Sequence, residues 1–292
     1  MEYYKFKEEL LLALHKHYTV PYRIETDVVT KNNGQKMDAI RIHLEGSMIA
    51  PTIYPRQIFD MNRKEPIPID QLIQQLDNAF VDESNPLSQY VNFISSYDWA
   101  KDHVILKVIN QDANQELLKN IPHFPLSDLA IYFSLLLPNR GNEYGTIQIT
   151  NRIMEEWGVT ESELYDQAQI NTPHLLPARL RTMDSFLPSF PPGTQVPQDM
   201  YILTNQYGIC GASCIAYNHL LKDLANQFNS SYFILPSSIH ECILLPAPNM
   251  ARHRELTKLV QEVNDTVLEP TEILSNHAYF YNCKSGDIVS LI

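Results

Sequence analysis

The stretch from Met200 to Pro246 constrains the fold of this chain most, because short apolar runs alternate in it with one helical pattern. Two runs rich in β-forming residues, Tyr201 to Thr204 and Ala212 to Tyr217, flank a turn with two glycines, which predicts a hairpin. After Asn218, the expected cap, apolar residues recur at helical spacing (Leu221, Leu224, Ala225 and Phe228). The stretch therefore predicts a helix that lies on a small sheet.

The remaining C-terminal residues continue this alternation. Apolar runs predict strands at Tyr232 to Leu235, Ile239 to Leu245 and Ala278 to Tyr281. A second helical pattern covers residues 255–264. The resulting order, ββα-ββ-α-β, predicts an α+β fold of mainly antiparallel sheets with helices on one face.

The N-terminal residues predict a helix followed by a hairpin. Residues 2–17 carry an apolar stripe at helical spacing, and a second helical pattern covers residues 69–80. Between them, Asn32-Asn33-Gly34 separates two alternating runs, residues 23–30 and 37–44, and Asn-Gly in such a position is a strong hairpin signal. The proline-bounded segment 47–55, SMIAPTIYP, is expected to be extended.

Turn signals divide the chain into α+β units. A turn cluster at residues 83–86 ends the first unit, residues 1–85. A middle unit (residues 86–184) and a C-terminal unit (residues 200–292) are separated by a proline-rich linker at residues 185–199.

The middle unit repeats features of the C-terminal one. Its apolar runs predict strands at residues 104–109, 129–137 and 146–150. Thr160 and Glu163 form a capping box that opens a helix, and Pro173 is expected to end it. The ββα passage at residues 129–157 is similar in order and size to residues 201–228, which raises the hypothesis of an internal ββα duplication.

Composition limits the classes of function. The formal net charge is −12 with a pI near 5.2, so binding to a phosphate backbone would oppose the overall field, and no nucleic-acid partner is expected. No apolar run is long enough for a membrane helix, and the opening residues lack the pattern of a signal peptide. The glycines do not form a phosphate-binding loop, and no cofactor is expected. We therefore expect a cytoplasmic protein without a membrane partner, whose cysteines are thiols.

Two cysteines offer a candidate nucleophile. Cys210 or Cys214, with His240 as the base and Glu241 or Glu272 as the orienting group, has the residue types of a cysteine hydrolase. Such an enzyme needs a thiol of lowered pKa, whereas the alternation around Cys214 is typical of a small core residue, and neither thiol is expected at a strand-to-helix elbow. Buried structural thiols are the favoured interpretation, and the hydrolase is the alternative.

The segment from Pro236 to Glu241, PSSIHE, places hydroxyls, an imidazole and a carboxylate beside apolar strands. Ser237, Ser238 and His240, together with Asn205, could present a polar rim to a small ligand or a peptide. In the competing, favoured interpretation, a Pro-Ser-Ser turn uses its hydroxyls to satisfy its own backbone groups. No metal site is expected, because the close cysteine pair has no second pair to complete it.

Three motifs are distinctive as a set: L-T-N-x-x-G from Leu203, P-S-S-I-H-E from Pro236, and W-G-x-T-E-x-E-L-Y from Trp157. With these motifs the chain resembles, through most of its length, a bacterial family of uncharacterised proteins, domain of unknown function 5688. The resemblance implies a bacterial, cytosolic setting. Because the family is uncharacterised, it transfers no catalytic residue.

These observations favour a non-catalytic binding or regulatory protein with an unknown protein or small-molecule partner. The extended segment 47–55 and the edges of the predicted sheets are natural surfaces for a partner chain. The sequence leaves the oligomeric state open.

Overall fold

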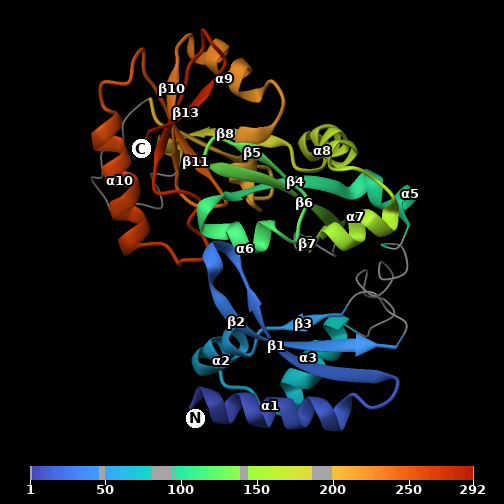
Figure 1. The fold of residues 1–292 in the computed structure, drawn as a ribbon. Helices are drawn as coiled ribbons and strands as arrows, with labels where there is room; N and C mark the ends of the chain where they lie inside the picture. Colours follow the sequence, from blue (N-terminus) through green and yellow to red (C-terminus); the bar gives the residue numbers. More distant parts are fainter. Residues whose placement is uncertain are drawn as a thin grey trace. The chain divides into compact units, whose positions relative to one another are not determined.

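The computed structural model describes residues 2–45, 50–80, 94, 96–138, 144–185 and 199–291. The chain divides into two compact units, residues 1–100 with 136–147 and residues 101–135 with 148–292 (Figure 1). The predicted boundary near residue 85 and nearly all of the predicted linker at 185–199 lie outside the described residues. Within the described ranges, no helix has the length and hydrophobicity that a membrane span requires.

The first unit packs helices against one face of a small antiparallel sheet with the order β1-β2-β3. Its elements are α1 (Tyr3–His17), β1 (Tyr22–Thr30), β2 (Lys36–Leu44), β3 (Thr52–Ile53), α2 (Pro55–Lys64), α3 (Ile69–Phe80) and α5 (Tyr97–Ala100). Phe6, Leu10 and Leu14 of α1 form a fully buried stripe that packs with Ile40 and Ile42 of β2. The predicted N-terminal helix is thus confirmed, and α2 is an element that the sequence reasoning missed.

The hairpin predicted from Asn32-Asn33-Gly34 is confirmed. β1 and β2 pair from Tyr22↔Leu44 to Thr30↔Lys36. Asn33 and Gly34 have φ values of 59° and 69°, in the left-handed region that asparagine and glycine adopt most readily.

The second unit is built on two antiparallel sheets. One has the order β4-β6-β5, with β7 also paired to β6, and its strands are β4 (Val104–Asn110), β5 (His123–Leu126), β6 (Leu129–Pro138) and β7 (Tyr144–Gln148). The end of β6 and most of β7, within residues 136–147, are grouped with the first unit. The other has the order β13-β12-β10-β11-β9-β8, with β8 (Ala178–Thr182), β9 (Tyr201–Asn205), β10 (Tyr232–Pro236), β11 (Cys242–Pro246), β12 (Ala278–Tyr281) and β13 (Ile288–Leu291). Because β8 pairs with β9, residues on both sides of the predicted linker share one sheet.

The helices of the second unit are α6 (Gln115–Leu118), α7 (Asn151–Trp157), α8 (Glu161–Leu175), α9 (Leu220–Phe228) and α10 (His253–Thr266). The capping box at the start of α8 is present: the Thr160 hydroxyl accepts from the Glu163 N–H, and the Glu163 carboxylate accepts from the Thr160 N–H. Helix α8 does not end at Pro173 as expected but continues to Leu175.

Helices lie on both faces of the six-stranded sheet, whereas the sequence predicts one covered face. Phe233 of β10 packs with Leu256 and Val260 of α10. Its neighbour Tyr232 points to the opposite face, where its hydroxyl donates to the Leu221 carbonyl of α9. The fold class, α+β with antiparallel sheets, agrees with the prediction.

Residues 211–216 form a buried 3₁₀-helix, η5 (Gly211–Ala216), where the sequence reasoning predicts a strand. The passage at residues 201–228 therefore contains one strand instead of two, and the repeat that suggested an internal duplication is absent there. Side chains of other elements hold η5 in place: the Ser213 hydroxyl accepts from the Val108 N–H of β4, and the Gln169 amide of α8 donates to the Ala216 carbonyl.

Candidate functional site

The structure brings together two residues proposed as a nucleophile and base, Cys210 and His240. Cys210 immediately precedes η5, has a left-handed backbone with φ of 48°, and is half-buried. His240 lies on the loop between β10 and β11. The contact joins the backbone of one residue to the ring of the other, because the Cys210 N–H donates to Nδ1 of His240 over 3.2 Å.

This contact determines the proton arrangement of the ring. An Nδ1 atom that accepts an N–H bond carries no proton, so the neutral imidazole of His240 is protonated at Nε2. The ring nitrogen that faces Cys210 is thus occupied by the backbone amide and does not accept the thiol proton in this arrangement. The geometry is that of a backbone latch rather than of a cysteine–histidine dyad.

The backbones beside this latch approach each other closely. A Cβ atom at Gly211 would lie 2.1 Å from Thr204 Oγ1 and 2.4 Å from the His240 carbonyl oxygen. The Thr204 hydroxyl donates to that same carbonyl over 2.8 Å, and the Ala212 N–H donates to the Ile239 carbonyl over 3.3 Å. The turn at residues 206–211 and the loop at residues 237–241 are therefore fastened together, and we call this pair the clasp.

Asn205, predicted as a ligand-binding residue, organises the turn of the clasp. Its side chain is 1% exposed. Its Oδ1 accepts from the N–H groups of Tyr207 and Ile209, and its Nδ2 donates to the Ile209 carbonyl. These three bonds place both polar atoms of the amide inside the turn.

The serines and the glutamate of PSSIHE bond within their own loop. The Ser238 hydroxyl accepts from the His240 N–H over 3.0 Å, and the Ser237 hydroxyl donates to the Glu241 carboxylate over 3.5 Å. The N–H groups of both serines donate to the Glu241 carbonyl. Glu272 contributes its backbone carbonyl, which accepts from Ile239. The segment thus bonds partly within itself and partly, through Ile239 and His240, to the neighbouring turn and to Glu272.

The four thiols occupy different environments. Cys214 is buried on η5, its Sγ donates to the Thr204 carbonyl, and burial raises its pKa from 9.0 to about 12. Burial also raises the pKa of Cys242, with smaller contributions from Cys214 and Glu241. Cys283 is exposed. Among the described residues, no group of three or more His, Cys, Asp or Glu side chains is placed to hold a metal ion.

Two tyrosines near Cys210 were not found from the sequence. Burial raises the pKa of both Tyr132 on β6 and Tyr217 after η5, and proximity to the Cys210 thiol adds to the rise in each case. The Tyr217 hydroxyl donates to the Leu176 carbonyl. No local signal marks Tyr132, because it comes from a strand distant in the chain, whereas Tyr217 lies only at the other end of η5.

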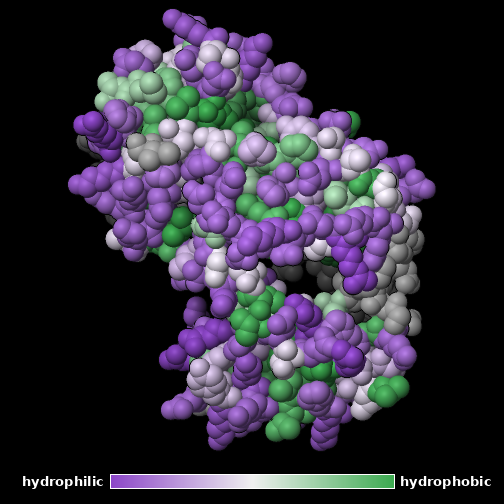
Figure 2. Space-filling model, in the orientation of Figure 1, coloured by the Kyte–Doolittle hydropathy of each residue, from purple (hydrophilic) through white to green (hydrophobic). Residues whose placement is uncertain are grey.

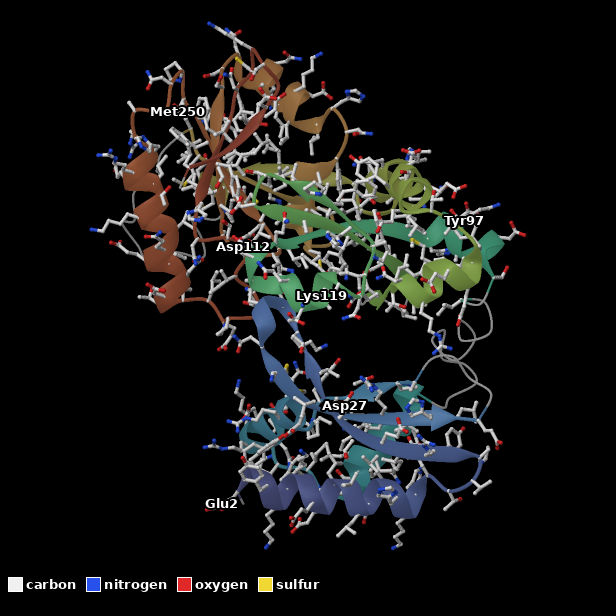
Figure 3. All side chains as sticks on the ribbon, in the orientation of Figure 1. Glu2, Asp27, Tyr97, Asp112, Lys119 and Met250 are labelled. Carbon is white, nitrogen blue, oxygen red and sulfur yellow. The ribbon has the colours of Figure 1, made fainter. Side chains whose placement is uncertain are left out.

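A second feature of the unit is a groove of about 450 Å³ beside α10. Its lining comes from the end of β11, the start of α10 and the loop between them, together with β10 and Asp199: Phe233, Leu245, Pro246, Ala247, Pro248, Asn249, Ala251, Arg252 and Leu256. Met250, on the same loop, is 45% exposed and lies just before the helix (Figure 3). Hydrophobic side chains also reach the surface in this part of the unit (Figure 2). The sequence reasoning missed this groove, whose only local mark is the stiff Pro-Ala-Pro segment.

Comparison with known proteins gives a family but no characterised relative. Neither the curated proteins nor the solved structures contain a match to the chain. The model of one family of unknown function matches residues 3–283, which is essentially the whole chain. The protein therefore belongs to the family of unknown function DUF5688.

Proposed function

We propose that this protein is a non-catalytic, cytoplasmic binding protein of bacteria that holds an apolar segment of a partner polypeptide in the groove beside α10. The observation that carries the proposal is the groove itself. Its volume of about 450 Å³ lies in the range of ligand-binding pockets.

The lining of the groove suits apolar side chains. Phe233, Leu245 and Leu256 supply an aromatic and aliphatic floor, and such pockets anchor the central residues of protein interfaces. Pro246 and Pro248 stiffen the wall and lack N–H groups, so a partner gains mainly from burial of its side chains there.

The rim of the groove is polar and adaptable. Arg252 is exposed and forms a two-point ion pair with Glu255, at 2.9 and 3.1 Å. Asn249 and Asp199 add polar groups. Met250, exposed on the same loop, can repack against partners of different shape. An apolar centre with a polar rim is the usual anatomy of a protein interface.

The contacts of the clasp support binding rather than catalysis. His240 accepts a backbone amide, and Asn205 and Ser238 satisfy turn groups, so these candidate residues have structural partners. The alternative, a cysteine hydrolase that uses Cys210 or Cys214 with His240, would require a different arrangement of the ring.

The experiment is a selection of peptides from a displayed random library on the purified protein. Ala251 is exposed and lines the groove, so Ala251→Trp places an indole in the binding space at little cost to the fold. We expect apolar peptides whose affinity, measured by fluorescence anisotropy, falls at least about tenfold in this variant.

Ala178→Trp is the matched control, since Ala178 is exposed on β8 and does not line the groove. It should leave the peptide affinity unchanged. Selected peptides that bind both variants equally would place binding elsewhere and reject the groove. Recovery of no groove-dependent peptide would also count against the proposal.

A further inference from the structure

The first unit has an exposed sheet edge. β1 lies at the end of the sheet order β1-β2-β3, and β2 is its partner among the described strands. The Glu45 N–H donates to the Pro21 carbonyl, and the Lys31 N–H donates to the Gln35 carbonyl. These bonds fix the alternation: odd-numbered residues of β1 bond to β2, and the N–H and C=O groups of Ile24 and Thr26 point away from it.

This edge is long and accessible. Arg23, Thr26, Asp27 and Val28 are exposed, and Val28 is 56% exposed. The Val28 N–H bonds to the Asp27 carboxylate, whereas the outward groups of Ile24 and Thr26 meet no other strand in the described part of the chain. A strand edge with such open backbone groups is a template for pairing with another strand.

We propose that this edge pairs with the same edge of a second copy of the chain, antiparallel and centred on Ile24. The carrying observation is the charge order along β1: Arg23 and Glu25 flank Ile24 on the sheet face opposite α1, where they form an ion pair within each chain that a second copy can share. In this register Arg23 of each copy lies directly opposite Glu25 of the other, and opposite charges in that position attract.

Neighbouring registers are disfavoured by the same charges. Centring on Arg23 or on Glu25 would place that residue opposite its own copy, and centring on Thr26 would place Glu25 opposite Asp27. Like charges directly opposite each other destabilise a strand pair. The Ile24 register instead gives two favourable pairs by symmetry and the isologous geometry of a twofold dimer.

A hollow at the start of β1 fits this arrangement. It has a volume of about 530 Å³ and is lined by Val20, Pro21, Tyr22, Arg23, Glu25, His43 and Glu45. Val20 is 89% exposed there. In the proposed register, residues 27–29 of the second copy lie beside Val20 of the first. The second copy's strand would therefore cover Val20 at this hollow. Pairing would produce one six-stranded sheet from two three-stranded sheets, with both β1 edges removed.

Sedimentation equilibrium of the full chain tests the dimer, with charge reversals as probes. Arg23→Glu and Glu25→Arg each place like charges opposite each other twice, and each should raise the dimer dissociation constant about tenfold. The double variant restores opposite charges in the swapped order, so it should return the constant to near that of the parent.

Arg179→Glu is the control, because Arg179 is an exposed arginine on β8, the edge strand of another sheet. It should leave dimerisation unchanged, and circular dichroism confirms that each variant is folded. We take ~100 µM as a generous upper limit for the dissociation constant of a specific weak interface. A parent protein that is still monomeric at that concentration would overturn the proposal. A dimer that the single reversals do not weaken, or that the double variant does not rescue, would overturn the register.

Discussion

The hydroxyl of Thr172 on α8 accepts a hydrogen bond from the backbone N–H of Leu106 on β4, over 3.0 Å, and donates to the Ala168 carbonyl over 2.6 Å. Thr172 and Leu106 are both fully buried. One threonine thus satisfies an N–H group on the outer edge of β4. We predict that Thr172→Val, which keeps the shape but removes the acceptor, lowers the free energy of unfolding by about 1–3 kcal/mol. Urea denaturation measures the change.

Thr182→Val on β8 is the control for this substitution, since Thr182 is exposed at a sheet edge. It should change stability by less than about 0.5 kcal/mol. Equal effects of the two substitutions would show that the contact between Thr172 and Leu106 does not stabilise the fold.

A glycine is needed at Gly211 because the neighbouring atoms leave no room for a Cβ atom, not because of its backbone angle. We predict that Gly211→Ala lowers the free energy of unfolding by about 3 kcal/mol, because the new methyl group would overlap Thr204 Oγ1 and the His240 carbonyl oxygen. Gly158→Ala is the matched control: it has φ of 68° and no atom within 4 Å of the added Cβ, so only the backbone penalty of about 1–2 kcal/mol applies. If Gly211→Ala costs no more than Gly158→Ala, the clasp is not as tight as described.

Burial of Cys214 makes stability depend on alkaline pH. Its pKa rises from 9.0 to about 12 on folding, so the folded state keeps a proton that the unfolded state loses in this window. The contribution of this thiol to the free energy of unfolding is therefore fully present below pH 9. It is lost as pH rises toward 12, by up to about 1.4 kcal/mol per pH unit.

Urea denaturation at several pH values between 8 and 10.5 measures this slope. Cys214→Ala should reduce the slope of the unfolding free energy against pH by an amount that corresponds to up to one bound proton. The slope should not vanish, because Cys242 and the buried tyrosines still contribute. Cys283→Ala, which removes an exposed thiol, is the control substitution. An identical slope in the parent and Cys214→Ala would contradict the assigned burial effect.

Local chemistry made parts of this fold predictable. Asn33 and Gly34 define a hairpin turn almost by themselves, and Thr160 with Glu163 defines a helix start, because each structure forms among neighbouring residues. The same is true of the apolar stripe of α1. Structures that form among residues close together in the sequence can be predicted without the rest of the fold.

The errors arose where distant residues decide the backbone. All residues of η5 are buried, so its apolar content indicates burial and not the strand that alternation suggested. Pro173 is tolerated near the end of α8, where the side chain of the preceding Thr172 bonds to both α8 and β4. The proximity of Cys210 to Tyr132 and the lining of the groove likewise depend on packing between separate elements, which spacing in the sequence does not encode.

The thiols give the most direct test of the latch between Cys210 and His240. With iodoacetamide at neutral pH, followed by mass spectrometry, Cys283 should react first because it is exposed, and Cys210 more slowly because it is half-buried. Cys214 and Cys242 should react only after unfolding, since burial raises the pKa of both. His240 bonds to the backbone of Cys210, so His240→Ala should not slow alkylation of that thiol. Slower alkylation in this variant would instead show that the imidazole activates the thiol, as a cysteine hydrolase requires.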